Sequence, residues 1–112
     1  MENRFSIRYN LDQLPETIST VLLVLPDKSE IESQVVDISS QGLKLSIPPT
    51  PFSLAIPRKA ETAEVIFQIS RLSLTCRCIY SAYNPDGSMH MGMHVFDPHQ
   101  QILLRSLLEE CG

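Results

Sequence analysis

Alternation of apolar and polar residues over most of the chain predicts a series of short β-strands. Residues 43–47 (LKLSI) alternate strictly and end at two prolines, which is typical of a half-buried strand. Other segments rich in apolar residues and bounded by turn residues have the same character. The predicted strands are residues 17–25, 31–38, 43–47, 63–69, 72–80 and 88–96. Short connections between them favour antiparallel pairing.

The apolar spacing changes to three and four residues after residue 96, which predicts a C-terminal helix ending near Glu110. Asp97 is the expected N-cap, Pro98 suits the first helical position, and Gln100 occupies the capping-box position. The apolar stripe that should dock on the sheet consists of Ile102, Leu103, Leu104, Leu107 and Leu108.

The chain has 112 residues and a mass of 12.6 kDa, which is the size of one domain. Residues 1–16 contain few consecutive apolar positions and include Pro15, so we expect an N-terminal arm there, followed by a folded unit over residues 17–112. Six short strands and one helix favour an all-β fold, a small six-stranded antiparallel β-barrel capped by a C-terminal α-helix. Closing the barrel would remove exposed strand edges.

Composition narrows the function classes. A net charge of -4 argues against a general nucleic-acid binder, which would need many phosphate contacts. No run of about 18 apolar residues is present, so membrane insertion is not expected. The N-terminus lacks the features of a secretory signal, and the odd set of Cys76, Cys78 and Cys111 does not indicate a disulfide framework. We expect a cytoplasmic protein.

Two short motifs contain the candidate binding chemistry. Arg4 and Arg8 are separated by three residues in the predicted arm, and each guanidinium can present a planar set of donors to phosphates or a guanine edge. Asp37, Ser39 and Gly42 follow at the end of a predicted strand, with the carboxylate and hydroxyl two residues apart and hence on one face. Taken singly, the arginines fit a solvated arm and the second motif fits a hairpin whose side chains satisfy turn amides.

The two motifs in this order resemble the PilZ domain family, which binds the bacterial second messenger cyclic di-GMP. Arg4 and Arg8 match its RxxxR motif, and the Asp37 segment matches its (D/N)xSxxG motif. A closing Gly-x-x-x-Phe strand from Gly92 to Phe96 and the C-terminal helix extend the resemblance over nearly the whole chain.

The resemblance implies that the arginine arm wraps the ligand against a six-stranded barrel. Arg4 and Arg8 would contact phosphates and guanine edges, Asp37 and Ser39 would hydrogen-bond a guanine, and Gly42 would shape the turn. A carboxylate suits the N–H donors of guanine, while arginine suits its acceptors.

Zinc binding is a weaker alternative. Thiolates and imidazoles are zinc ligands, and the chain contains Cys76, Cys78, His90, His94 and His99. The two neighbouring cysteines alternate on an apolar strand face that includes Leu74 and Tyr80, so we expect them to be buried and free of metal. The methionines of residues 89–94 are expected in the core, with the histidines outside.

No signature of a nucleophile paired with a base is present, so we do not expect an enzyme. The leading hypothesis is a cyclic di-GMP receptor or adaptor, without a cofactor, that signals through ligand-dependent interaction with an unidentified effector protein. The alternative is a PilZ-like protein-interaction module that does not bind the nucleotide.

Overall fold

The computed structural model of the chain describes residues 9–10, 16–49 and 56–111, with side chains for residues 18–49 and 56–110. The elements in chain order are β1 (Tyr9–Asn10), α1 (Glu16–Ser19), β2 (Thr20–Val24), β3 (Glu30–Ser39), β4 (Gly42–Ile47), β5 (Thr62–Phe67), β6 (Leu72–Tyr83), β7 (Met89–Val95) and α2 (Pro98–Cys111).

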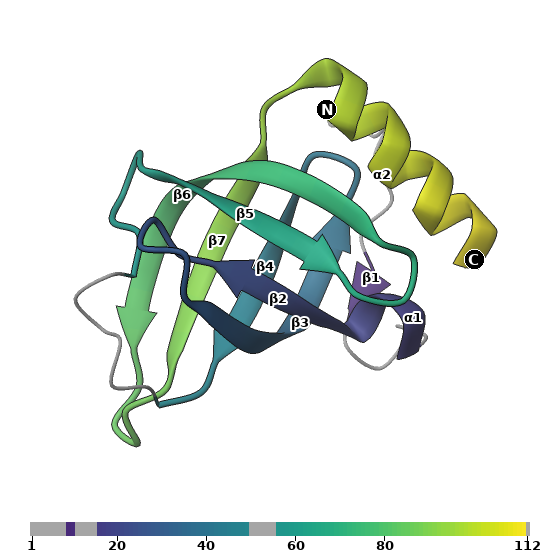
Figure 1. The fold of residues 1–112 in the computed structure, drawn as a ribbon. Coiled ribbons are helices and arrows are strands. Elements are labelled where there is room, and N and C mark those ends of the chain that lie inside the picture. Colours follow the sequence, from purple (N-terminus) through teal and green to yellow (C-terminus); the bar gives the residue numbers. More distant parts are fainter. Residues whose placement is uncertain (1–8, 11–15, 50–55, 112) are drawn as a thin grey trace, which may run out of the picture.

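Six of the strands close into an antiparallel barrel, which confirms the predicted fold class (Figure 1). The order around the barrel is β3, β2, β5, β6, β7 and β4, and β4 pairs again with β3. β3 is long enough to hold a seventh, two-residue strand. β2 pairs with residues 30–34 of β3, and β1 pairs with Asp37 and Ile38, both on the side opposite β4. β1 and β2 therefore lie one after the other along β3.

The N-terminal prediction is wrong in one detail, because the strand expected from Thr17 begins at Thr20. Residues 16–19 form the single helical turn α1, and Ile18 within it is completely buried. The local sequence suits a strand, but burial of Ile18 against the barrel overrides this preference. The segment expected to be an arm also contains β1.

The strand expected over residues 63–69 is also shorter than predicted. β5 ends at Phe67, and the turn that follows is closed by a 2.7 Å hydrogen bond from the Arg71 amide to the Phe67 carbonyl. Arg71 adopts the left-handed conformation with φ 62°. Ile69 thus lies in a turn with its side chain 66% exposed.

Two β-bulges reverse the inward and outward alternation along their strands. In β3, Val35 pairs with Leu45 and Asp37 pairs with Lys44, so Val36 is an extra residue. In β6, Cys78 pairs with Met93 and Tyr80 with Gly92, so Ile79 is extra. Because side chains alternate with a period of two, each extra residue moves the following side chains to the opposite face.

The β6 bulge corrects the expectation that Tyr80 shares the inner face with Cys78. Tyr80 is 43% exposed on the outer face, and its ring lies directly over Gly92. A β-carbon at Gly92 would collide with that ring. The glycine therefore provides the space that the outward-facing ring occupies.

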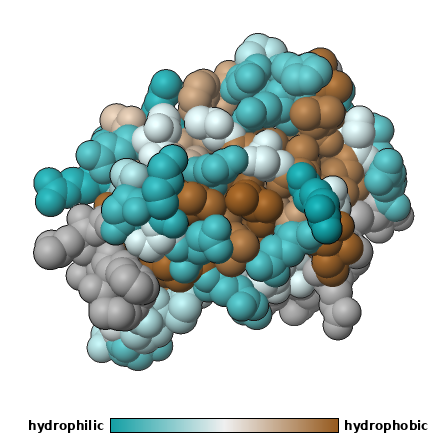
Figure 2. Space-filling model, viewed as in Figure 1, coloured by the Kyte–Doolittle hydropathy of each residue, from teal (hydrophilic) through white to brown (hydrophobic). Residues whose placement is uncertain are grey.

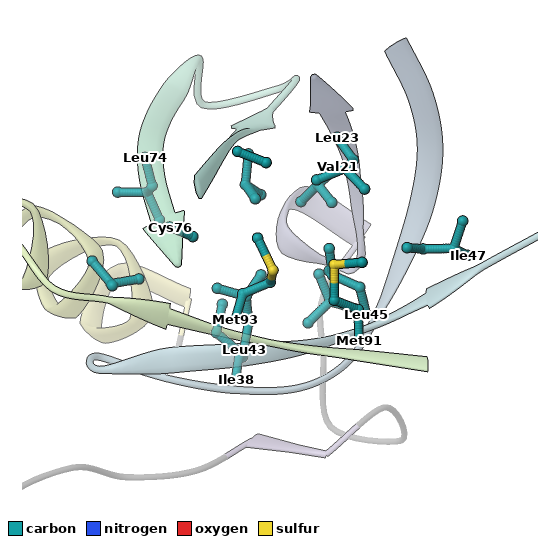
Figure 3. Packing of buried hydrophobic residues seen from close by; sticks show 14 of the residues in the cluster. Val21, Leu23, Ile38, Leu43, Leu45, Ile47, Leu74, Cys76, Met91 and Met93 are labelled. Carbon is teal, nitrogen blue, oxygen red and sulfur yellow. The ribbon is translucent and has the colours of Figure 1, made fainter. Parts of the chain in front are cut away.

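The barrel interior is filled by side chains from every strand of the closed barrel. Figure 3 shows Met91 and Met93 of β7 directed to the interior together with Leu43 and Leu45 of β4. His90 and His94 alternate with these methionines and are only partly buried, as predicted. Further core residues are Val21, Leu23, Val35, Ile38, Ile47, Val65, Phe67, Leu74, Cys76 and Val95.

Helix α2 lies against one end of the barrel and contacts β3, β6 and β7 (Figure 1). Asp97 is its N-cap, as predicted, since the carboxylate accepts a 2.9 Å hydrogen bond from the His99 amide. Gln100 does not complete a capping box. Its side chain accepts a 2.9 Å hydrogen bond from the Thr75 amide and so fixes the helix to β6.

The predicted apolar stripe of α2 is wider than the part of the helix that is buried against the barrel. Leu104 and Leu108 are buried and Leu107 is partly buried, whereas Ile102 is 53% and Leu103 is 40% exposed. The helix is 14 residues long. Within the described ranges, no helix is long and apolar enough to cross a membrane.

Burial should keep Cys76 unreactive in the folded protein. Its thiol is completely inaccessible, and burial raises its pKa from 9.0 to about 12. In a Cys111→Ser background, we expect thiol reagents to label Cys76 only when the protein unfolds. Cys76→Ser should lower the free energy of unfolding by about 1–3 kcal/mol, because a hydroxyl is then buried at an apolar site.

Alkaline pH provides a second measurement on Cys76. The unfolded thiol ionises near pH 9.0, before the folded thiol does, so this group contributes stability that is complete below pH 9 and is lost as the pH rises towards about 12. The free energy of unfolding of wild type should exceed that of Cys76→Ala below pH 9, and this difference should shrink as the pH rises above 9. Rapid labelling of Cys76 in the native protein would contradict its buried position.

Candidate functional site

Asp37 reaches the outer surface of the barrel because of the bulge at Val36. Before the bulge, Ile31 and Val35 point inward, and with unbroken alternation Asp37 would also do so. After the bulge Ile38 is completely buried and Asp37 is only partly buried. Bulges commonly re-aim side chains in this way beside functional sites.

The neighbours of Asp37 come from two other strands. Its register partners are Asn10 of β1 on one side and Lys44 of β4 on the other. Lys44 alternates with the buried Leu43 and Leu45, which places its side chain on the outer face. A carboxylate acceptor and an ammonium donor therefore stand on adjacent strands.

Ser39 is the last residue of β3 and is only 3% exposed. Its hydroxyl accepts a hydrogen bond of 3.3 Å from the Gln41 amide and donates one of 3.5 Å to the Gly42 carbonyl. Both distances are long for hydrogen bonds. In this structure Ser39 interacts with its own hairpin, and the long distances leave the hydroxyl weakly held.

Gly42 begins β4 and approaches β7 closely. A β-carbon at this position would lie 2.6 Å from the Met93 carbonyl oxygen, which is far inside van der Waals contact. A residue without a side chain is therefore needed at this position, where β4 and β7 lie close together. This is a packing requirement of the barrel at the end of the Ser40–Gln41 turn.

The motif hairpin is fastened to β7 through the Gln41 carbonyl. This oxygen accepts a 2.9 Å hydrogen bond from the Val95 amide, and Nδ1 of His94 lies 3.0 Å from it. With the Nδ1–H tautomer, His94 donates to the same carbonyl. His94 thus holds the hairpin in place, a role that the sequence did not reveal.

Further cationic and aromatic groups lie on the same outer face. His94 pairs in register with Arg77 of β6, whose guanidinium carbon is 4.5 Å from the centre of the Phe96 ring. One row higher in register, Lys44 pairs with Gly92, over which the Tyr80 ring lies. Alternation in β4 would have identified Lys44, but Tyr80 depends on the β6 bulge.

Arg4 and Arg8, the two predicted arginines of the site, lie outside the described residues. The nearest described residue is Tyr9, which follows Arg8 in the sequence and pairs with Ile38 of β3. The two described residues that follow the first motif in the sequence, Tyr9 and Asn10, therefore pair with the strand that carries the second motif. The structure brings Asp37, Ser39 and Gly42 together in one hairpin.

The alternative of a zinc site finds no support in the described part of the chain. Cys76 and Cys78 are buried free thiols inside the barrel, while His90 and His94 lie on its outer side. Among the residues with described side chains, no group of three potential ligands is close enough to hold a metal ion.

The closed barrel, its outward-facing motif hairpin and the helix at its end define a class of small β-barrel domains with a candidate ligand site on the outer wall. The chain belongs to the PilZ domain family, whose family model matches residues 2–110. This confirms the resemblance recognised in the sequence.

A solved structure supports the same fold. The crystal structure of YcgR in complex with c-di-GMP from Escherichia coli matches 97% of this chain with a TM-score of 0.61 and 12% sequence identity. The chain spans 46% of the matched YcgR chain, which is therefore a considerably larger protein. No match was found among curated proteins.

The position of Gly42 leads to a stability prediction. Gly42→Ala should lower the free energy of unfolding by about 1–3 kcal/mol, because the added methyl group forces β4 away from the Met93 carbonyl. Denaturant unfolding measures this change. The matched control is Gln41→Ala, whose exposed side chain should contribute less than about 0.5 kcal/mol. Equal stability of the two variants would refute the packing role of Gly42.

Proposed function

We propose that this domain is a cyclic di-GMP receptor that signals through ligand-dependent interaction with an effector protein. The observation that carries the proposal is the pairing of β1 with the second half of β3. Tyr9 and Asn10 lie opposite Ile38 and Asp37. The chain segment that follows Arg8 is thereby adjacent to the (D/N)xSxxG hairpin.

The chemistry of the outer face suits a nucleotide with two guanines and two phosphates. Asp37 offers carboxylate oxygens to the N1–H and N2–H donors of a guanine. Lys44 stands beside it and offers a positive charge to a phosphate. Arg4 and Arg8 would add two guanidinium groups. These local cations would allow a chain whose net charge is -4 to bind an anionic ligand.

Support also comes from the family and from the similar fold of YcgR, which was crystallised with c-di-GMP. In the proposed mechanism, Gly42 and His94 position the hairpin, Asp37 and Ser39 bind a guanine, and the arginines close over the ligand. Ser39 would exchange its weak hairpin bonds for a bond to the base. This is a binding role, in which the domain changes the surface presented to an effector and performs no chemical step.

Titration calorimetry with cyclic di-GMP tests the proposal. The wild type should bind, and Arg4→Ala, Arg8→Ala and Asp37→Ala should each weaken binding tenfold or more, because a hydrogen bond to a charged group contributes about 1.5–3 kcal/mol. The matched control is Arg105→Ala on the exposed side of α2, which should leave affinity unchanged.

Thermal unfolding of each variant must accompany these titrations, so that lost binding is separated from lost folding. Absence of heat with folded wild type would favour the alternative, a PilZ-like interaction module that does not bind the nucleotide. Unchanged affinity in both arginine variants would remove the first motif from the site.

Hydrogen exchange tests the closing of the N-terminal segment. Saturating cyclic di-GMP should slow amide exchange in residues 4–8, because two phosphates held by Arg4 and Arg8 would restrain that segment. Residues 98–110 of α2 serve as an internal reference that should not change. Identical exchange of residues 4–8 with and without ligand would disprove the switch mechanism even if binding is measured.

A further inference from the structure

Three apolar side chains lie together on the outer face of β2 and β5, which no other described element covers. Leu22, Val24 and Ile66 are all partly exposed there, while Val21, Leu23 and Val65 of the same strands fill the core. Strands that are apolar on both faces are typical of sheets covered on both sides. Figure 2 shows the corresponding hydrophobic patch at the centre of the face that β2 and β5 present.

Carboxylates border this patch in register. In one row across the strands, Glu30, Val24 and Glu64 are neighbours, and in the next row Glu32, Leu22 and Ile66 are neighbours. All three glutamates are exposed. The rows continue on β6 with Thr75 and Ser73, so neither row contains a lysine or arginine within these four strands. We name the apolar trio and its three glutamates the acidic-apolar face.

We propose that the acidic-apolar face is a docking site for a partner protein that presents an amphipathic helix with lysines or arginines flanking an apolar stripe. Apolar side chains at helical spacing would cover Leu22, Val24 and Ile66. The basic flanks would pair with Glu30, Glu32 and Glu64. Charge complementarity of this kind selects partners and steers their association.

The charges argue against other occupants. A second copy of this chain related by two-fold symmetry would place the same glutamates against one another. An anionic lipid surface or a nucleic acid would meet like charge. A partner strand has no backbone edge to extend here, because β2 already pairs with β3 and β5, and β5 pairs with β2 and β6. A basic helix remains, recognised through its side chains.

The face is connected to the candidate ligand site through one strand. Glu30 and Glu32 lie in the first half of β3, and Asp37 and Ser39 lie in the second half beyond the bulge. The inference that this face is the effector surface of a receptor rests on the proposed function. Docking of a helix is nevertheless measurable without the nucleotide. Failure of helix docking can therefore be distinguished from failure of nucleotide binding.

The test uses a synthetic helical peptide of about 18 residues built from leucine and lysine, with leucines spaced three and four apart. Two matched peptides carry glutamate for every lysine or serine for every leucine. Binding to the full chain is measured by fluorescence anisotropy, with and without saturating cyclic di-GMP, and the contact face is mapped by amide chemical shifts. We expect only the leucine-lysine peptide to bind, with shifts confined to residues 20–24, 30–34 and 62–67.

A charge-reversal pair distinguishes the face from overall acidity. Glu30→Lys/Glu32→Lys should weaken peptide binding about tenfold. Glu109→Lys/Glu110→Lys, which changes net charge equally on the exposed side of α2, should have a much smaller effect. The proposal would be overturned if both charge-reversal variants lost the same affinity, or if the peptide did not bind in either ligand state. Chemical-shift changes outside the acidic-apolar face would also overturn it. So would shifts in the protein alone that grow with its concentration, because they would indicate self-association. Equal docking with and without nucleotide would support the face and contradict ligand-dependent signalling.

Discussion

A strand of a closed barrel has one face in the core and one on the surface, and a single extra residue exchanges the two. The bulge at Val36 makes this exchange at the middle of β3. It directs Ile38 into the core and leaves Asp37 outside. Without it, a carboxylate would be buried among apolar side chains, at a cost of several kcal/mol. Core packing and the candidate site thus depend on the same irregularity.

A second bulge, at Ile79, lies in register with the first. Asp37, Lys44, Gly92 and Tyr80 follow one another in register across β3, β4, β7 and β6. The two bulges therefore lie in one row and bring a carboxylate and an aromatic ring to the same outer wall. Between them stand a lysine and a glycine. The family's Gly-x-x-x-Phe pattern thus has a packing explanation at Gly92, where the ring occupies the space of a side chain.

Sequence reasoning succeeded where each element obeys one period. Strict alternation in residues 43–47 predicted the strand β4, and Asp97 predicted the start of α2. Prediction from the sequence failed where tertiary contacts decide which side chains are buried. The alternation cannot reveal a bulge whose extra residue is as apolar as its neighbours, which is why Tyr80 was placed on the wrong face. The width of the α2 stripe likewise depends on how much of the helix the barrel end can cover.

The short strand β1 affects the tendency of this chain to associate with other chains. It occupies the side of β3 that β2 leaves at Gln34, and so pairs the backbone of Asp37 and Ile38. Removing Tyr9 and Asn10 would expose that stretch as an open strand edge, a template for pairing with other chains. β1, which lies next to the candidate site, thus also protects against aggregation, and its release would expose an unpaired strand edge beside the motif hairpin.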